Sequence, residues 1–308
     1  MASGVLDGAG DRYAAAQSSF NPEGKSILDS VITGKTYRGR IPSAEVSALM
    51  KAERLTRDAL MLKLIPVAKS FAHAPLSNYF VGAVVLGRSS SLYLGCNIEI
   101  PGNMLGLAVH GEQAATANAY MSEETGIEAI TVGGAPCGHC RQFLSETSLD
   151  LAMRVIMKDG SSVRLSELLP QAFGPRNLGF NQGSFPVKRA RLSTTANSSD
   201  PLVREALNAA CAAYTPYTRS PSGVSLLTSN GRVFSGSYIE NAAFNPSLPP
   251  LETALAGYFA AGQKGGQIER AVLLEKEKPG ISHETTTRSA LAVLAPSVRL
   301  ETYLAVGG

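Results

Sequence analysis

The chain has 308 residues, 44% of them hydrophobic and 17% charged, which is the composition of a globular protein of about two domains. The net charge of +3 comes from scattered basic residues, which argues against a protein that grips a long nucleic acid with a basic stripe. Four cysteines are too few for a disulfide scaffold, and no run of about 18 apolar residues occurs, so we expect a cytoplasmic protein without a membrane span.

The N-terminal part of the chain predicts an arm followed by a helix and a hairpin. Residues 1–44 are weakly patterned and lack the apolar core of a secretory signal, which predicts a mobile arm or a short helical prelude. Apolar residues recur at near-helical spacing over residues 43–71 and predict a helix. Two strands, at 79–86 and 91–97, are expected to form a hairpin.

Helices and strands alternate after the hairpin. The pattern predicts a helix over residues 105–121, a strand over 127–132, a helix from Pro136 to Ser145, and a strand over 151–157. This order predicts a sheet with helices on its faces.

A second unit with the same order of elements follows a linker. Residues 186–201 are rich in Ser, Thr, Asn and Pro and predict a linker between a domain at 45–185 and a second domain at 202–308. The expected elements of the second domain are a helix at 202–214, strands at 224–227 and 233–238, a helix at 252–261 and a strand at 271–274. We infer an internal duplication, the alternative being two unrelated α/β units.

Two short motifs carry metal-binding chemistry, His110-Gly111-Glu112 and Pro136-Cys137-Gly138-His139-Cys140. One imidazole, His110, and two thiolates, Cys137 and Cys140, leave one tetrahedral position open, which is typical of catalytic rather than structural zinc. The start of a helix also stabilises thiolates. Glu112 follows His110 closely enough to face the same cavity and move protons for an activated water. We therefore predict one zinc ion per chain, with Glu112 as the catalytic acid and base.

The motifs together match the H-x-E and P-C-x-x-C signature of zinc deaminases, and the chain resembles the homodimeric, two-domain cytidine deaminases of bacteria and plants. Residues 168–175 (LLPQAFGP) and 235–250 (SGSYIENAAFNPSLPP) also carry this resemblance. It implies an α/β fold, a three-layer α/β/α sandwich with a mixed sheet, duplicated as a catalytic and a degenerate domain. The implied activity is hydrolytic deamination of cytidine and 2′-deoxycytidine to uridine and 2′-deoxyuridine with release of ammonia, in pyrimidine salvage.

The resemblance also implies how the substrate is held. Asn97 and Glu99 would hold the ribose hydroxyls, and backbone groups of Gly111 and Ala135 would meet the base edge. The family's aromatic residue falls on Tyr79, but Phe80 stands beside it in place of an asparagine, so either ring is a candidate for contact with the base.

A further set of residues is expected around the metal and at the subunit contact. The resemblance implies that Phe173 and the Ala243-Phe244 turn come from the neighbouring subunit of a homodimer and cover the pocket. In the degenerate domain, Pro250-Leu251-Glu252 is expected to occupy the place of His-x-Glu. We also expect Arg141 to donate to a thiolate and so to offset the negative charge of the two sulfurs.

Three alternative functions stay open at this point. A polynucleotide deaminase needs a basic, aromatic-lined channel, whereas this chain has no Trp and only 6% aromatic residues. A non-catalytic zinc protein needs a fourth protein ligand, for which Cys96 is the candidate, and would leave Glu112 without a task. A nucleotide deaminase needs a phosphate-binding loop, which is not evident near the motifs.

Overall fold

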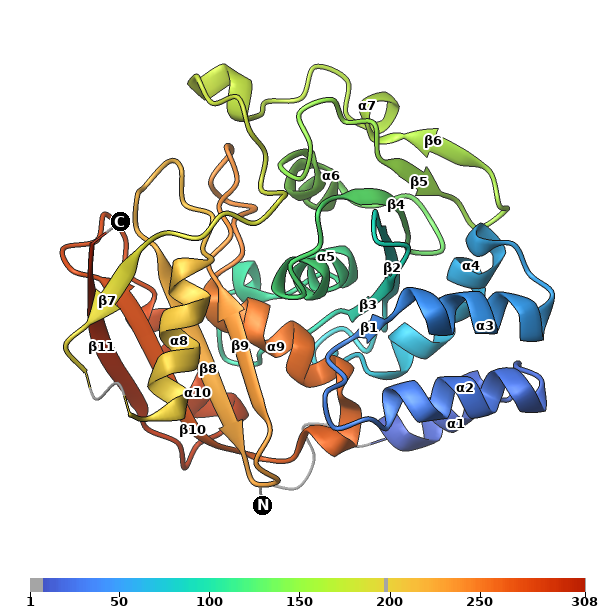
Figure 1. The fold of residues 1–308 in the computed structure, drawn as a ribbon, viewed down its shortest axis with the longest axis horizontal. Coiled ribbons are helices and arrows are strands. Elements are labelled where there is room, and N and C mark those ends of the chain that lie inside the picture. Colours follow the sequence, from blue (N-terminus) through green and yellow to red (C-terminus); the bar gives the residue numbers. More distant parts are fainter. Residues whose placement is uncertain (1–7, 197–198, 308) are drawn as a thin grey trace.

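The structure, a computed structural model, describes residues 8–196 and 199–307, which form two β-sheets with helices packed on them (Figure 1). The first sheet has the strand order β1-β3-β2-β4-β5-β6 and the second the order β7-β11-β10-β8-β9. The strands are β1 (Arg40–Ile41), β2 (Gly82–Gly87), β3 (Leu92–Cys96), β4 (Ile127–Thr131), β5 (Arg154–Ile156), β6 (Ser162–Arg164), β7 (Leu192–Thr194), β8 (Ser222–Thr228), β9 (Val233–Ser237), β10 (Ile268–Lys276) and β11 (Leu300–Gly307).

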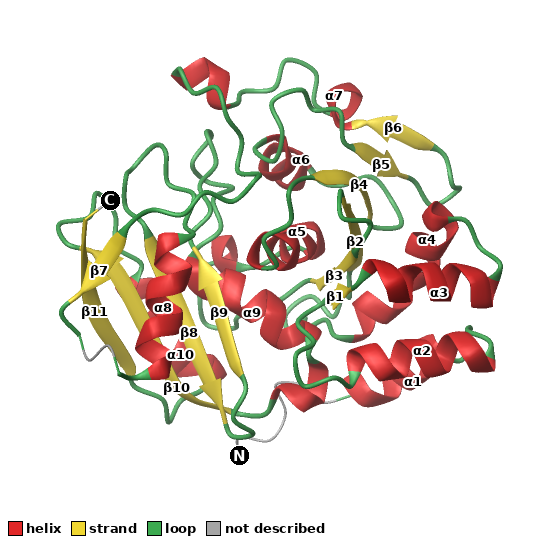
Figure 2. Cartoon of the chain, viewed as in Figure 1, coloured by secondary structure: helices red, strands yellow, loops and turns green. Residues whose placement is uncertain are grey.

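Helices of varied length connect the strands, and two of them lie in the middle of the molecule, between the sheets (Figure 2). These two are α5 (Gly111–Met121) and α9 (Pro250–Ala260). The others are α1 (Ala9–Gln17), α2 (Pro22–Ile32), α3 (Ser43–Glu53), α4 (Arg57–Ser70), α6 (Gly138–Ser145), α7 (Leu165–Leu168), α8 (Pro201–Cys211) and α10 (Glu284–Leu294). Short 3₁₀ turns lie at η1 (Leu105–Leu107), η2 (Pro175–Leu178) and η3 (Gly262–Gly265).

Both sheets repeat one topology. In the first, the hairpin β2–β3 pairs antiparallel with β4, which pairs in parallel with β5. In the second, β8–β9 pairs antiparallel with β10, which pairs in parallel with β11. An isolated bridge partner beyond each hairpin repeats as well, since Ile98 bridges Val109 and Ile239 bridges Leu248. The internal duplication and the mixed α/β sheets predicted from the sequence are confirmed.

Two glycines let helices approach the first sheet closely on opposite faces. A Cβ added to Gly82 would meet the backbone of Lys69 in α4, and one added to Gly95 would meet the backbone of Ala115 in α5. Gly82 is paired with Cys96, the residue next to Gly95. Paired residues share a face and neighbours along a strand point to opposite faces, so α4 and α5 cover the two sides of the sheet as a three-layer sandwich requires.

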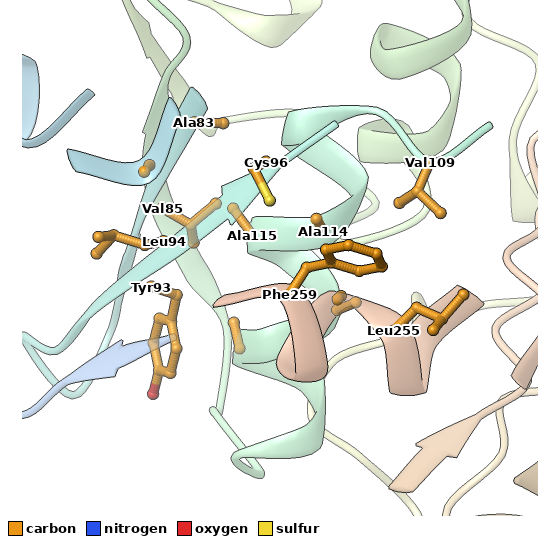
Figure 3. Packing of buried hydrophobic residues seen from close by; sticks show 14 of the residues in the cluster. Ala83, Val85, Tyr93, Leu94, Cys96, Val109, Ala114, Ala115, Leu255 and Phe259 are labelled. Atoms are coloured by element: carbon orange, nitrogen blue, oxygen red, sulfur yellow. The ribbon is translucent and has the colours of Figure 1, made fainter. Parts of the chain in front are cut away.

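One hydrophobic core runs through both halves of the chain. The small side chains of Ala114 and Ala115 on α5 let Leu255 and Phe259 of α9 pack close to β3, as Figure 3 shows. All four side chains are fully buried. Burial of apolar area on this scale stabilises a fold strongly, so the second half is an integral part of the structure that holds α5.

The observed elements correct several predictions from the sequence. The helix expected over residues 43–71 is two helices, because Arg54 adopts a left-handed conformation with φ of 55° between α3 and α4. The helix expected from residue 105 begins only at Gly111, because Val109 is extended and bridges Ile98. The sequence did not predict α10 and β11, which complete the second unit.

Regular structure also occurs in the N-terminal segment, where a mobile arm or a short helical prelude was expected, and in the expected linker. Residues 8–44 include α1, α2 and β1, and the side chain of Arg12 donates from Nε to the carbonyl of Ser70 at 3.0 Å. The stretch 186–201, expected as a linker, contains β7, which pairs with β11 of the second sheet. In both places the chain is ordered by contacts with residues distant in sequence, which local pattern does not reveal.

The close approach at Gly95 gives a stability test. We expect Gly95→Ala to cost about 3 kcal/mol or more of unfolding free energy, because the added methyl overlaps the backbone of α5 and neither side can yield easily. Urea denaturation measures this. The control is Gly174→Ala, whose Cβ would meet nothing within 4 Å and should change stability by less than about 0.5 kcal/mol. Equal stabilities for the two variants would contradict the close contact.

Candidate active site

Three metal-ligand atoms converge at one end of the first sheet. Nδ1 of His110 lies 3.4 Å from Sγ of Cys140 and 3.5 Å from Sγ of Cys137. These three donors lie within 4.8 Å of one another and are the one group of this kind among the described residues. The cysteines are not in disulfides. The sequence prediction of His110, Cys137 and Cys140 as neighbours is therefore reproduced by the fold.

Two helix starts bring the donors together. The bridge between Ile98 and Val109 ends the extended segment, so His110 becomes the N-cap of α5. Its backbone N–H donates to Oε1 of Gln113 at 3.1 Å. Cys137 is the N-cap of α6, and Cys140 lies one turn further along that helix. Partial positive charge at the start of a helix favours thiolates there.

The donor set fits a zinc ion. Zinc binds histidine nitrogen at about 2.0–2.1 Å and cysteine sulfur at about 2.3 Å, so tetrahedral geometry requires N···S separations of about 3.6 Å. The observed separations of 3.4 and 3.5 Å match this value. Burial lowers the pKa of His110, and the neighbouring His139 adds to this, which favours the neutral imidazole that a metal ligand requires. His139 itself is not part of the donor group.

Burial and nearby negative groups work against a free thiolate in this cluster. The pKa of the Cys140 thiol is raised by burial and further by Glu112 and Cys137. A bound divalent cation reverses this balance, because its charge stabilises coordinating thiolates. A bound cation would therefore stabilise the deprotonated form of this cluster.

Glu112 lies beside the donors on the first turn of α5 and is only 4% exposed. Burial raises its pKa, while its own backbone N–H and the Cys140 thiol favour the charged form. A carboxyl group whose pKa is raised accepts and releases a proton more readily at neutral pH than an exposed carboxyl group does. This property suits the acid and base role predicted from the sequence.

A cavity of about 930 Å³ opens next to the donors. Its lining includes eight of the residues predicted for catalysis, substrate binding or metal binding; they are Tyr79, Asn97, Glu99, His110, Gly111, Glu112, Ala135 and Cys137. One wall comes from α4, through Leu62, Ile65, Pro66 and Lys69, which the sequence did not single out. Leu62 and Ile65 are half-buried and Pro66 and Lys69 are exposed, and nothing in the local pattern distinguishes such a pocket wall from an ordinary helix surface.

Asn97 and Glu99 are held in place by the loop before β2. Oδ1 of Asn97 accepts from the Val81 N–H at 2.8 Å, and its Nδ2 donates to the Tyr79 carbonyl at 2.9 Å. Oε2 of Glu99 accepts from the N–H groups of Leu76 and Ser77 at 2.8 and 3.0 Å. Although partial burial opposes it, hydrogen bonds from Ser77 and Leu76 lower the pKa of Glu99, which keeps the carboxylate charged.

Arg141 does not make the contact expected from the sequence. Its Nε donates to the Pro136 carbonyl at 2.8 Å and its Nη1 to the Leu168 carbonyl at 2.9 Å. Within the described part of the chain, no hydrogen bond joins it to a cysteine sulfur. The carbonyls of the turn before α6 and of the last residue of α7 accept from the guanidinium instead, so Arg141 fixes the turn that leads into Cys137.

The second copy of the fold lacks the donors, but the position equivalent to His-x-Glu differs by one residue from the prediction. α5 begins at Gly111 and α9 at Pro250, and Gly236 lies against the carbonyl of Pro250 as Gly95 lies against that of Gly111. Pro249 therefore corresponds to His110, and Leu251 to Glu112. Sequence comparison aligned the glutamates, whereas the start of the helix determines the correspondence.

The residues predicted to cover the pocket lie elsewhere on the surface. Phe173 is 45% exposed and Phe244 is 62% exposed. Neither they nor Ala243 line the cavity of their own chain. At the cavity itself, Tyr79 is 72% exposed, so the mouth is open in a single chain.

Comparisons with known proteins agree with this geometry. Two family models, both describing the cytidine and deoxycytidylate deaminase zinc-binding region, match residues 54–157 and residues 165–288. A cytidine deaminase of Vibrio atlanticus is 40% identical over 282 residues, which cover 92% of this chain and 95% of that protein. Cytidine deaminases of Vibrio parahaemolyticus and Sodalis glossinidius are each 38% identical and cover 88% and 92% of this chain, and 91% and 95% of their own lengths.

Metal analysis tests the donor cluster. We expect the purified protein to hold one zinc ion per chain, and the variants His110→Ala, Cys137→Ala and Cys140→Ala to lose it, because two donors bind zinc far more weakly than three. Elemental analysis after gel filtration measures the ratio. Cys211→Ala is the matched control, since this free cysteine lies outside the cluster. Zinc retained in the Cys137 and Cys140 variants would contradict the assignment.

Proposed function

The chain belongs to the cytidine deaminase family, and we propose that its pocket takes free cytidine and 2′-deoxycytidine and returns uridine and 2′-deoxyuridine, as pyrimidine salvage requires. It is a zinc-dependent enzyme that deaminates cytidine. One observation carries the proposal, namely the convergence of His110, Cys137 and Cys140 beside the buried Glu112 on the wall of one cavity. Each residue role below rests on that arrangement.

The reaction needs a water molecule that attacks the base and a group that carries its protons to N3 and to the leaving amine. His110, Cys137 and Cys140 would hold the zinc ion, which would supply a water molecule of lowered pKa for attack on C4 of the base. Glu112 takes one proton of that water and delivers it to N3. It then carries the second proton to the exocyclic amine, which leaves as ammonia while the C4 carbonyl forms. Both water protons are thereby accounted for, one on N3 of the uridine and one on the ammonia.

The ribose end of the substrate would meet Asn97 and Glu99. A carboxylate has about four acceptor positions and an amide has two donor hydrogens and two lone pairs. The loop contacts of Glu99 and Asn97 use only part of this capacity, so both side chains keep the means to bind ribose hydroxyls. Backbone groups of Gly111 and Ala135 on the same cavity would meet the base edge.

We assign contact with the base to Tyr79 rather than Phe80. Both rings line the cavity, but Phe80 is half-buried and the guanidinium of Arg12 lies 4.7 Å from its ring centroid, so one face of this ring is already packed. Tyr79 is exposed on the cavity lining and has a free face. A flat pyrimidine gains stabilisation from stacking on such a ring.

A homodimer would complete the pocket. Leu76, Met104 and Leu105 expose more than half of their surface beside the mouth of the cavity, and Phe173 and Phe244 are exposed away from it. An apolar rim and separate exposed aromatic residues on one chain are what an interface between two copies requires. We propose that Phe173 and the Ala243-Phe244 turn of one chain cover the cavity of the other.

The rival functions have less support. The described residues contain a three-member donor group that does not include Cys96, which leaves the fourth metal position for water rather than for a structural ligand. None of the helices in the described ranges is long and apolar enough to cross a membrane. We propose a cytoplasmic enzyme that acts on free nucleosides, with neither nucleic acid nor a membrane as its partner.

Replacement of the proton carrier gives the sharpest functional test. We expect Glu112→Gln to retain zinc but to lower kcat for cytidine by about 10²- to 10⁴-fold, because the amide cannot transfer the proton. The fall in absorbance on conversion to uridine measures the rate.

The matched control is Glu252→Gln, a buried glutamate one position beyond the counterpart of Glu112 in the second copy. It should keep the wild-type kcat. A Glu112→Gln enzyme with near-normal kcat would overturn the role of Glu112, and tenfold faster deamination of single-stranded DNA than of cytidine would favour the polynucleotide enzyme.

Complementation tests the shared active site. We expect Glu112→Gln and Phe244→Ala to be impaired as separate proteins, but a mixture refolded together to regain up to about a quarter of wild-type activity. Half of the dimers then carry one site with both an intact Glu112 and an intact partner Phe244. Activity that stays at the sum of the two separate proteins would show that Phe244 serves its own chain.

A further inference from the structure

The helix that carries two metal ligands also holds both segments proposed to cover the partner's pocket. Cys137 and Cys140 lie at the start of α6, whereas Gln142 and Glu146 lie toward its end. Residues four apart on a helix share one face, so Gln142 and Glu146 present their side chains to the same neighbours.

Gln142 contacts both covering segments directly. Its Nε2 donates to the carbonyl of Phe173 at 2.7 Å and to Oδ1 of Asn241 at 3.2 Å. Asn241 returns the contact, because its Nδ2 donates to the Gln142 carbonyl at 2.8 Å. Asn241 is fully buried, and its Oδ1 also accepts from the N–H of Ala243 at 3.0 Å. The turn at Ala243-Phe244 is thus fixed to α6 through one amide pair.

Glu146 holds the same turn from its other side. Its Oε2 accepts from the N–H of Ala242 at 2.9 Å, and its Oε1 accepts from the hydroxyls of Tyr214 and Tyr217 at 2.8 and 2.5 Å. The carboxylate is only 1% exposed. Burial raises the pKa of Glu146, whereas the donors from Tyr217, Ala242 and Tyr214 favour the charged form. A buried carboxylate with three donors holds its partners firmly, since leaving any of them unpaired is costly.

Aromatic contacts extend this network to the other covering segment. The ring of Tyr217 lies 5.2 Å from that of Phe180 and 6.3 Å from that of Phe244. From α5, the Nε2 of Gln113, the neighbour of Glu112, donates to the carbonyl of Pro246 at 3.4 Å. Both helices of the metal site therefore contact the turn that carries Phe244.

We propose that Gln142 and Glu146 are positioning residues that act on the partner's active site. They hold the covering segments at Phe173 and Phe244 in fixed positions relative to α6 of their own chain. This inference rests on the proposed homodimer. It predicts that loss of these contacts weakens substrate binding in trans and leaves the chemical step of the same chain unchanged. In each chain, α6 then carries two donors of its own site and holds the segments that cover the partner's cavity, so it connects the two active sites.

Heterodimers with one live site separate the two directions of action. In the trans arrangement, one chain carries Gln142→Ala with Glu112→Gln and its partner is wild type, so the live site faces the altered cover. In the cis arrangement, the chain with Gln142→Ala keeps Glu112, and its partner carries Glu112→Gln alone. Different affinity tags on the two chains allow each heterodimer to be purified, and zinc content is measured for both.

We expect KM for cytidine to rise about fivefold or more in the trans arrangement, with kcat and zinc content changed little, because about one net hydrogen bond of positioning is lost. The cis arrangement should match a heterodimer that carries only Glu112→Gln. Gln142 is half-buried, so the variant should fold. Gln267→Ala, at an exposed glutamine, is the matched control and should have no effect in either arrangement.

Glu146→Gln provides a second test. The rise in KM in the trans arrangement should be smaller than that for Gln142→Ala, because the tyrosine hydroxyls can rotate and accept hydrogen bonds from the new amide, although the Ala242 N–H can only donate. A KM change confined to the cis arrangement, or an unchanged KM in both arrangements, would overturn the inference. Phe244→Ala in the same two arrangements distinguishes the causes. If it also acts only in cis, the proposed dimer fails, whereas if it acts in trans while Gln142→Ala does not, only the positioning role fails.

Discussion

The separations of 3.4 and 3.5 Å between one imidazole nitrogen and two sulfurs depend on where two helices begin. His110 is the N-cap of α5, Cys137 is the N-cap of α6, and Cys140 lies in the first turn of α6, so all three donors lie at helix starts. This placement requires α5 to sit directly on β3, which the absence of a side chain at Gly95 allows. The metal site is therefore a consequence of the close packing of α5 on the sheet, and that packing is shared with α9 from the second half of the chain.

The second copy of the fold has a structural role but lacks the metal-donor residues of the first. It repeats the sheet order and the glycine against its central helix, but Pro249 and Leu251 stand at the positions of His110 and Glu112. The loop that follows its hairpin, with Asn241 and Phe244, is fixed to α6 of the first copy. Without the donors, the second copy is a scaffold that packs against α5 and carries the exposed aromatic turn.

The sequence predicted the duplication and the donor motifs that the fold brings together, because both leave local signals. His-x-Glu and Cys-x-x-Cys are short motifs whose chemistry is readable without a fold, and the repeated order of elements survives in the hydrophobic pattern. Other features depend on contacts between distant residues. The helix break at Arg54, the ordering of α1 by Arg12, the pairing of β7 and the contacts of Arg141 have no local pattern. The one-residue error at Pro250-Leu251-Glu252 has the same origin, since a matching glutamate was visible and the start of α9 was not.

The central claim is that the donor cluster holds one metal ion that each chain uses to deaminate cytidine. A titration of metal-free protein with zinc, followed by the rate of uridine and ammonia formation, tests it most directly. The account predicts that the rate rises linearly and stops rising at one zinc per chain, with uridine and ammonia released in equal amounts. A protein that binds one zinc per chain and forms no uridine, or a rate that saturates at half a zinc per chain, would contradict it.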